Sequence, residues 1–348
     1  MTVACSSPLA RRCPAAGFDA SRRLVSVRQP FIAQRSWLLT WASLLLAAGW
    51  LVCPALAHAQ AKTATAEFPL ELVRFEPDQR NPVFTAAGPG NWDVKIRERG
   101  WILKEGDRWH LWYSGYDGTR INRVRLGYAT SDDGIQWHRH PHNPIDADDW
   151  IEDPVVVRDG ETLHLIAEGR DDQPHRFTST DGLTWHRQGG LDVRRVDGRP
   201  LESGPLGTPT VIRTAEGWNL LYERRDAGVW LARSPDLRRW TNVRDEPVLT
   251  RDPEGPDSVM IALNQVLEYR GKYYAYYHGT RSPQRPRLWT TNVAVSDDLI
   301  TWRKYPGNPL LPEAENKSSG LVVFDGERFR LYTMHERVDL HWGERPAR

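Results

Sequence analysis

The stretch "SDDGIQW" at Ser131–Trp137 decides the fold, because the chain repeats it three more times. The repeats are "STDGLTW" at Ser179–Trp185, "SPDLRRW" at Ser234–Trp240 and "SDDLITW" at Ser296–Trp302. We call these four stretches the W turns. A motif that returns about every fifty to sixty residues is typical of an array of small domains or of a circular repeat fold. The residues between the W turns decide between the two.

A glycine-centred hairpin precedes each W turn, as in "WILKEGDRWHLWYSG" around Gly106. Apolar and polar residues alternate on both arms, which is the period of half-buried strands. Each W turn supplies a second hairpin, so one repeat holds four strands. The hairpin glycines are spaced 54, 57, 54 and 55 residues apart and are Gly106, Gly160, Gly217, Gly271 and Gly326. Five such repeats predict an all-β fold, a five-bladed β-propeller with four-stranded antiparallel blades.

The fifth repeat lacks an outer strand, and the N-terminal segment "FEPDQRNPVF" at Phe75–Phe84 is a candidate to supply it. In three repeats a proline lies seven residues after the last Trp of the W turn, as Pro144 follows Trp137. The N-terminal segment has the same spacing between Phe75 and Pro82. We therefore predict that this segment pairs with blade five and closes the ring. In the W turns, Ser and Asp should bond the turn backbone, Gly134 and Gly182 should take positive φ, and Trp should pack between blades.

The first 59 residues have the form of a signal peptide. Six arginines precede the apolar run Ser36–Val52, and Ala57-His58-Ala59 has the small-x-small pattern of a signal-peptidase site. We expect cleavage after Ala59, a single propeller domain at 60–348, and a periplasmic or secreted protein. A membrane anchor is the alternative, although the apolar run is short for a span.

Removing this leader changes the composition. All three cysteines lie in it, so the mature chain can form neither disulfides nor thiolates. The leader also holds six of the 46 basic and one of the 45 acidic residues, which leaves 40 and 44. A slightly acidic chain offers no electrostatic footprint for nucleic acid, and we expect neither a nucleic-acid partner nor membrane attachment after cleavage. We expect a monomer and no cofactor; a structural cation on the propeller axis stays open, because no ligand cluster has diagnostic spacing.

The propeller topology predicts one central pocket. The first strand of each blade runs from the ligand face to the hairpin glycine, and the second strand returns. Residues seven to nine before each glycine should line the pocket: Glu98, Arg99, Glu152, Asp153, Thr208, Pro209, Leu263, Asn264, Ser318 and Ser319. So should residues six to nine after it: Ser114, Glu168, Glu223, His278 and His335. Such a ring of carboxylates suits cleavage of glycosidic bonds.

The five repeats, the short W turn and "EDPVVV" at Glu152–Val157 resemble the five-bladed propeller glycoside hydrolases. These comprise the arabinanase and xylosidase, invertase and anhydrogalactosidase groups, with the mannoside phosphorylases as relatives. The resemblance spans the mature chain and implies a catalytic or transition-state role for Asp153. The Asp boxes of sialidases are a poorer match, since they carry one more residue before the glycine and occur on six blades. The family's Asp-Pro motif is missing from blade one, and no three acids reproduce the family's catalytic spacing.

Asp153 is the leading catalytic candidate, and Pro154 is expected to hold it in an extended conformation that points it at the axis. Like charges from Glu98 and Glu168 should raise the pKa of at least one carboxyl group. The full set of candidate catalytic acids is Asp153, Glu98, Glu223, Asp93, Glu202 and Asp257. Structural alternatives remain: Glu98 can pair with Arg97 or Arg99, and Glu168 and Glu223 can pair with the arginines that follow them.

Candidate substrate-binding residues surround these acids: Glu152, Glu168, Arg97, Arg99, Arg170, Arg224, Asn264, His278, Ser318, His335 and Trp92. Trp92, Tyr116, Trp150 and Trp289 can stack on pyranose faces or pack in loops. Three functions stay open. A hydrolase acting on a carbohydrate is favoured. A phosphorylase would need cationic groups around phosphate, and a sugar-binding propeller without chemistry would repeat its site in every blade.

Overall fold

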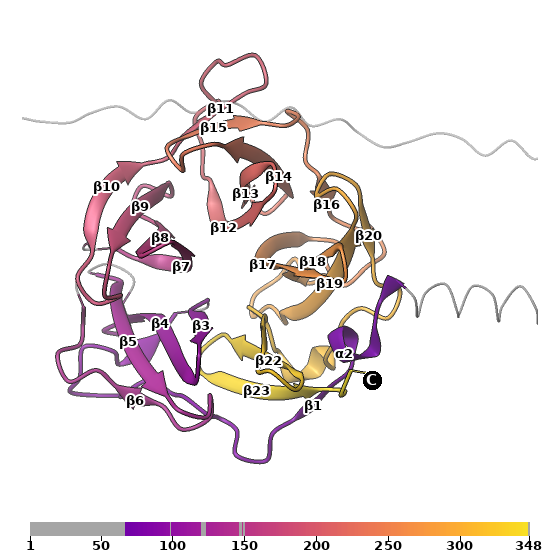
Figure 1. Ribbon diagram of the computed structural model, residues 1–348. Helices are drawn as coiled ribbons and strands as arrows, with labels where there is room; N and C mark the ends of the chain where they lie inside the picture. Colours follow the sequence, from indigo (N-terminus) through magenta and orange to yellow (C-terminus); the bar gives the residue numbers. More distant parts are fainter. Residues whose placement is uncertain (1–66, 98, 120–122, 146–147, 149, 347–348) are drawn as a thin grey trace, which may run out of the picture. The chain divides into compact units, whose positions relative to one another are not determined.

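Five β-sheets follow one another around a ring, one for each sequence repeat (Figure 1). The computed structural model describes residues 67–346 except 98, 120–122, 146, 147 and 149. The predicted signal peptide at 1–59 therefore lies outside the described residues. Within them, no helix has the length and apolar character that crossing a membrane requires. The predicted five-bladed, all-β propeller is confirmed.

The blades take their strands in chain order, apart from the outer strand of blade five. Blade one contains β2 (Lys95–Ile96), β3 (Trp101–Glu105), β4 (Arg108–Tyr116), β5 (Arg125–Ser131) and β6 (His138–Arg139). Blade two contains β7 (Glu152–Asp159), β8 (Thr162–Glu168), β9 (Pro174–Ser179) and β10 (His186–Gly190). Blade three contains β11 (Asp192–Arg194), β12 (Gly207–Thr214), β13 (Gly217–Glu223), β14 (Gly228–Ser234), β15 (Arg239–Asn242) and β16 (Leu249–Thr250).

Blade four contains β17 (Met260–Tyr269), β18 (Lys272–Thr280), β19 (Thr290–Ser296) and β20 (Trp302–Lys304). Blade five contains β21 (Leu321–Phe324), β22 (Phe329–Met334), β23 (Val338–Gly343) and β1 (Phe75–Pro77). The short helix α2 (Leu70–Val73) precedes β1, and the 3-10 helix η1 (Glu313–Glu315) precedes β21. Blades one and three depart from the predicted four strands. In blade one β2 pairs with β4 beside β3, and in blade three β11 pairs in parallel with β15 and β16 pairs with β14.

The W turns have the predicted internal hydrogen bonds. The hydroxyl of Ser131 accepts the backbone N–H of Gly134 at 2.9 Å, and Oδ1 of Asp133 accepts those of Ile135 and Gln136, each at 2.8 Å. The predicted positive φ is confirmed at Gly134 (70°) and at its counterpart Gly182 (73°). The same position in the other two W turns holds Leu237 and Leu299, at φ 61° and 64°. The turn geometry therefore overrides the usual preference for glycine there.

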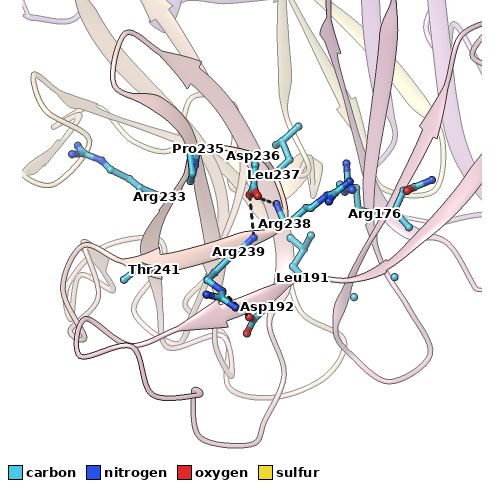
Figure 2. A pocket seen from close by; sticks show the side chains of 13 residues that line it. Arg176, Leu191, Asp192, Arg233, Pro235, Asp236, Leu237, Arg238, Arg239 and Thr241 are labelled. Atoms are coloured by element: carbon cyan, nitrogen blue, oxygen red, sulfur yellow. Dashed lines mark hydrogen bonds and ion pairs between the residues drawn. The ribbon is translucent and has the colours of Figure 1, made fainter.

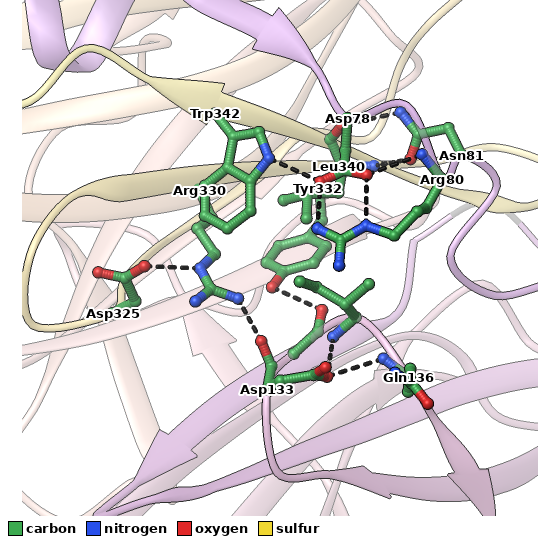
Figure 3. Close-up of polar contacts among 12 residues, drawn as sticks. Asp78, Arg80, Asn81, Asp133, Gln136, Asp325, Arg330, Tyr332, Leu340 and Trp342 are labelled. Carbon is green, nitrogen blue, oxygen red and sulfur yellow. Dashed lines mark hydrogen bonds and ion pairs between the residues drawn. The ribbon is translucent and has the colours of Figure 1, made fainter.

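The W turns also join neighbouring blades, as Figure 3 shows for blades five and one. Tyr332 of blade five donates its hydroxyl hydrogen to the carbonyl of Gly134 at 3.0 Å, and Arg330 bonds the carbonyl of Asp133. Trp112 of blade one donates in the same way to the carbonyl of Gly182 at 2.8 Å. The W turns thus belong to the scaffold that fixes the blades.

The predicted closure of the ring is confirmed. In Figure 1 the indigo strand β1 lies along the yellow strand β23, and the two pair in antiparallel register. Asp78, just after β1, accepts hydrogen bonds from Nε1 of Trp342 and from Arg80, both at 2.7 Å (Figure 3). The side-chain amide of Asn81 accepts the backbone N–H of Leu340 at 2.7 Å and donates to the carbonyl of Leu340 at 2.8 Å.

Blades one and four contain an asparagine that makes the same two hydrogen bonds as Asn81 makes in blade five. In those two blades the asparagine follows the blade's own outer strand. Asn143 exchanges hydrogen bonds with the backbone of Tyr128, at 2.9 and 2.8 Å. Asn308 does the same with Val293, at 3.0 and 2.9 Å. Each asparagine precedes a proline of the spacing described above. The N-terminal segment is therefore equivalent to an outer strand and its exit.

Candidate functional site

The central cavity lies where the first and second strands of several blades meet. Glu152 pairs with Glu168 in blade two, Gly207 with Glu223 in blade three, and Ala262 with His278 in blade four. The cavity has a volume of about 800 Å³. Its lining consists of Arg97, Glu152, Asp153, Glu168, Thr208, Glu223, Asp226, Met260, Ala262, His278, Arg285, Pro286, Arg287, Trp289, Asn316, His335 and Glu336. Seven of the candidate site residues are thus brought together.

Asp153 reaches the cavity, but not in the expected conformation. Its φ is 50°, in the left-handed region, so the extended conformation predicted from Pro154 is wrong. The register between β7 and β8 shifts between Glu152 and Val155, and the left-handed residue absorbs this bulge. Thr208 has φ 42° beside a similar register shift in blade three. Left-handed backbone at non-glycine residues costs on the order of 1–3 kcal/mol and clusters at functional sites.

Asp153, Glu168 and Glu223 bring carboxylates to the cavity from blades two and three, beside those of Glu152 and Asp226. The backbone N–H of Thr208 donates to Glu168, and that of Asp226 donates to Oε2 of Glu223 at 2.5 Å. Burial, followed by the negative charge of Asp153, raises the pKa of Glu168 well above its ordinary value. Burial, followed by the charge of Asp226, raises the pKa of Glu223 to about 8. Both shifts make a proton donor available at neutral pH.

Gly207 lies directly against two of these carboxylates. A Cβ atom built on it would lie 2.2 Å from Oε1 of Glu223 and 3.3 Å from Oε1 of Glu168. Only a residue without a side chain leaves both carboxylates in place. The sequence analysis missed this glycine, although its position immediately before Thr208 was a usable signal.

The substitution Gly207→Ala should therefore push Glu223 out of position. If Glu223 is a catalytic acid, as predicted from the sequence, we expect a loss of turnover of at least about tenfold, because a displaced acid loses much of its contribution. Kinetics on any glycoside that is turned over, with a thermal melt, would test this. Gly189→Ala is a matched control, because its Cβ would meet no atom within 4 Å, although its φ of 100° adds backbone strain. Equal turnover in Gly207→Ala and wild type would contradict the prediction.

Arg99 lies on the propeller axis and is 1 % exposed. Its guanidinium donates to the carbonyl of Pro209 at 2.8 Å, to that of Asn264 at 3.0 Å and to the hydroxyl of Thr210 at 3.0 Å. It also bonds the carbonyl of Asp153, and its backbone N–H reaches Oδ1 of Asp153 at 3.3 Å. Arg99 therefore ties blades one to four together and fixes Asp153.

This arrangement does not fit a cation on the axis. The carbonyl oxygens there already accept hydrogen bonds from a fixed positive charge, that of Arg99. Among the residues that the structure describes, no group of three or more His, Cys, Asp or Glu side chains is arranged to hold a metal ion.

Two histidines border the cavity on the side of blades four and five. Nδ1 of His278 lies 2.9 Å from Nδ2 of Asn264, and its ring packs edge-on against Trp289 with centroids 5.3 Å apart. Nδ1 of His335 lies 3.1 Å from the hydroxyl of Ser318. Asn264 and Ser318 are thus buried supports that orient histidines and do not themselves line the cavity.

Glu152 is engaged in a local ion pair. Arg97 bonds one of its carboxylate oxygens, and Nε1 of Trp150 donates to the other at 3.1 Å. Both charged side chains are largely buried and line the cavity. Their mutual neutralisation makes them suited to binding sugar hydroxyls.

Three candidate acids lie away from the cavity lining. Asp93 is buried in blade one and accepts hydrogen bonds from the hydroxyl of Tyr113 at 3.2 Å and from Arg139 at 3.4 Å. Asp257 is buried beside Lys304, with which it forms an ion pair. Glu202 is exposed on a separate surface hollow.

Three other candidates that the structure describes, Arg170, Arg224 and Trp92, also stand apart. Glu98 lies outside the described residues. Arg170 is exposed, with its guanidinium 4.8 Å from the ring centre of Trp150. Arg224 donates to the carbonyl of Glu202 at 2.8 Å. Trp92 packs against Tyr113, with ring centroids 5.7 Å apart.

The loop between β18 and β19 supplies cavity residues that the sequence analysis missed. Arg285 and Arg287 line the cavity opposite the carboxylates of blades two and three. The signal was the basic stretch "RSPQRPRLW" at 281–289, longer than the "RRDA" at 224–227 that joins the same strands in blade three. Asn316, Asp226 and Glu336 were also missed, and each lies in a loop without a periodic pattern.

Comparisons with solved structures agree with this fold. A glycosyl hydrolase from Bacteroides ovatus matches with a TM-score of 0.61 and 16% identity, covering 79% of this chain and 95% of that one. A structure from the GH130 family of mannoside phosphorylases, which contains glycoside hydrolases that target β-1,2-mannosidic linkages in Candida mannan, matches with a TM-score of 0.60 and 16% identity, covering 79% and 96%. The fold is that of the five-bladed propeller glycoside hydrolases.

Sequence comparison is consistent with this propeller fold. An uncharacterized protein of Mycobacterium tuberculosis is 26% identical over 217 residues, which cover 57% of this chain and 72% of that protein. The sucrose-6-phosphate hydrolase of Escherichia coli is 26% identical over 181 residues, covering 46% of this chain and 36% of the hydrolase. No family model matches the chain. The predicted resemblance to propeller glycoside hydrolases is confirmed.

Proposed function

We propose that this protein is an exported glycoside hydrolase that cleaves glycosidic bonds of an oligo- or polysaccharide in the central cavity. The observation that carries the proposal is the group of three carboxylates from Asp153, Glu168 and Glu223 in one cavity. Two of them have raised pKa values, and the third is bonded to the backbone of Arg99. Glycoside hydrolysis needs such a protonated donor beside an ionised partner.

In this proposal Glu223 is the general acid, and Asp153 is the base or nucleophile. Glu223 keeps its proton at neutral pH and gives it to the leaving glycosidic oxygen. Asp153 lies beside the cationic Arg99 and activates water or attacks the anomeric carbon. Trp289 and the Arg97–Glu152 pair position the sugar.

A phosphorylase is the second candidate, favoured by Arg285 and Arg287 in the cavity wall. The similarity to the GH130 family supports the same alternative. A panel of aryl glycosides and polysaccharides, with and without inorganic phosphate, distinguishes the functions. Release of free sugar without phosphate supports a hydrolase, whereas strict need for phosphate and formation of a sugar phosphate support a phosphorylase. Binding of glycans without any turnover across the panel would contradict both.

Export is part of the proposal and rests on the pattern of residues 36–59. If the leader is removed after Ala59, the mature chain begins at Gln60. N-terminal sequencing of protein recovered from its own cell envelope or medium tests this. An intact N-terminus in fully exported protein would contradict it.

The raised pKa of Glu223 predicts a pH dependence of stability. The unfolded chain ionises this carboxyl near its ordinary pKa of 4.5, but the folded protein keeps it protonated up to about pH 8. The unfolded state therefore binds fewer protons in this window, and the free energy of unfolding should fall as pH rises from about 4.5 to 8. The expected fall is about 5 kcal/mol.

Thermal melts of Glu223→Gln and of wild type across this range would check the prediction. The variant should lose less stability than wild type as pH rises, and turnover by wild type should decline above about pH 8. Substitution of the exposed Glu161 by Gln is the control and should follow wild type. Parallel stability curves for Glu223→Gln and wild type would contradict the assignment.

A further inference from the structure

A second hollow, of about 720 Å³, lies between blades two and three and contains no residue of the central cavity. Its walls come from β9 and β10 of blade two and from β11, β14, β15 and the W turn at Ser234–Trp240 of blade three (Figure 2). None of the innermost strands contributes to it. The hollow is therefore a separate concavity on the outer part of the ring, and its size would admit a short oligosaccharide.

Four arginines line this hollow, and two of them are already neutralised. Arg233 forms an ion pair with Glu216 at 2.7 Å, and Arg239 lies 3.4 Å from Asp192. For Arg176 and Arg238, no carboxylate lies within ion-pair distance among residues 67–346 that the structure describes. These two guanidiniums point toward each other in Figure 2.

Arg176 is the more unusual of the two arginines, because it lacks a carboxylate partner although it is only 8 % exposed. Within the part of the chain that the structure describes, its side chain has one hydrogen-bond contact, with Nδ1 of His164 at 3.5 Å. Burial and the neighbouring charge of Arg238 lower the pKa of Arg176. A buried guanidinium without a carboxylate is costly unless another anion balances it.

The acid in the same hollow, Asp236, offsets this charge only in part, because its effect on the pKa of Arg176 is smaller than those of burial and Arg238. Oδ1 of Asp236 accepts the backbone N–H of Arg238 at 2.9 Å, that of Arg239 at 3.3 Å and the hydroxyl of Ser234 at 3.1 Å. It is thus used to build the W turn, as its counterparts are in the other blades. Opposite it, the backbone at Gly189 is open, since a Cβ there would meet no atom within 4 Å.

We propose that this hollow binds an oxyanion carried by a glycan chain, with Arg176 and Arg238 as its two cationic contacts. Guanidinium groups bind carboxylate, sulfate and phosphate through paired, charge-assisted hydrogen bonds. The hollow is larger than a single free anion needs, which favours an acidic sugar within an oligosaccharide. The inference of an anion-binding site goes beyond the proposed function, whereas the choice of a glycan rests on it.

Calorimetric titration with a short oligomer of galacturonic acid and with its methyl-esterified, neutral counterpart tests the proposal. The titrations use the full-length mature protein carrying Asp153→Asn, so that turnover in the central cavity does not consume the probe. We expect the acidic oligomer to bind and the neutral one to bind at least about tenfold more weakly. Adding Arg238→Gln, which alters an exposed side chain, or Arg176→Gln should each weaken acidic-oligomer binding at least about tenfold.

Arg199→Gln is the matched control, since Arg199 is exposed, pairs with Asp197 and lies outside the hollow. It should leave binding unchanged. Unaltered binding of the acidic oligomer in a folded Arg238→Gln variant would overturn the proposal, as would equal binding of the acidic and neutral oligomers. Inorganic phosphate is the third probe: arginine-dependent binding of phosphate without binding of the oligomer would overturn the glycan part. Because the readout is binding, its failure is distinguishable from failure of the proposed hydrolase activity.

Discussion

Asp153→Asn is expected to lower turnover by roughly 10²–10⁴-fold, the usual contribution of a positioned acid or base. The amide has nearly the same size, so the left-handed backbone at this position and its hydrogen bonds to Arg99 can be retained. What the amide removes is the negative charge. Loss of that charge abolishes activation of water or nucleophilic attack without removing the fold.

Steady-state kinetics on a glycoside identified in the panel, together with a thermal melt, would check this result. Asp132→Asn is a suitable control, because Asp132 is 79% exposed and pairs with Arg108 in a W turn on the scaffold. Near wild-type turnover in Asp153→Asn would show that this aspartate is not catalytic. Loss of the folded state would show that its role is structural.

Deleting Glu71 to Phe84 is expected to abolish cooperative folding. The deletion removes β1, most of α2 and Asp78 and Asn81, which bond β23. Blade five would keep three strands and expose an unpaired edge, and unpaired edges favour aggregation. Leu72 is fully buried, so the deletion also opens the core beneath blades four and five.

Circular dichroism and differential scanning calorimetry would measure the effect. Asn81→Ala is the graded control: it loses the reciprocal bonds to Leu340 but keeps β1, and it should melt cooperatively at a lower temperature. A cooperative melt of the deletion variant at the wild-type temperature would refute the role of this segment in closing the ring.

Regular repeats made the fold predictable from local patterns. The hydrogen bonds of a W turn form between residues close in sequence, since Ser131 and Asp133 bond backbone groups within five residues. The same regularity placed strand ends in the cavity, so Glu168, Glu223 and His278 could be found by counting from glycines. Closure was predictable because Pro82 repeats a spacing found elsewhere.

Residues outside that regular pattern could not be placed in the same way. Arg285 and Arg287 reach the cavity from a loop, whose path depends on contacts distant in sequence. Asp257 belongs to a loop of blade four that turns toward Lys304 and away from the cavity. The left-handed φ of Asp153 depends on a bulge against β8 and on Arg99 of another blade, neither of which its own neighbours reveal.

The pairing of β1 with β23 also sets an order in time. During synthesis, residues 75–77 emerge before every other strand of the propeller, yet their partners at 341–343 emerge after all the others. Strand β1 therefore stays without its partner strand until almost the entire chain has been synthesised. The last blade is completed by the first strand, so a chain interrupted anywhere before β23 leaves both ends of the sheet array open.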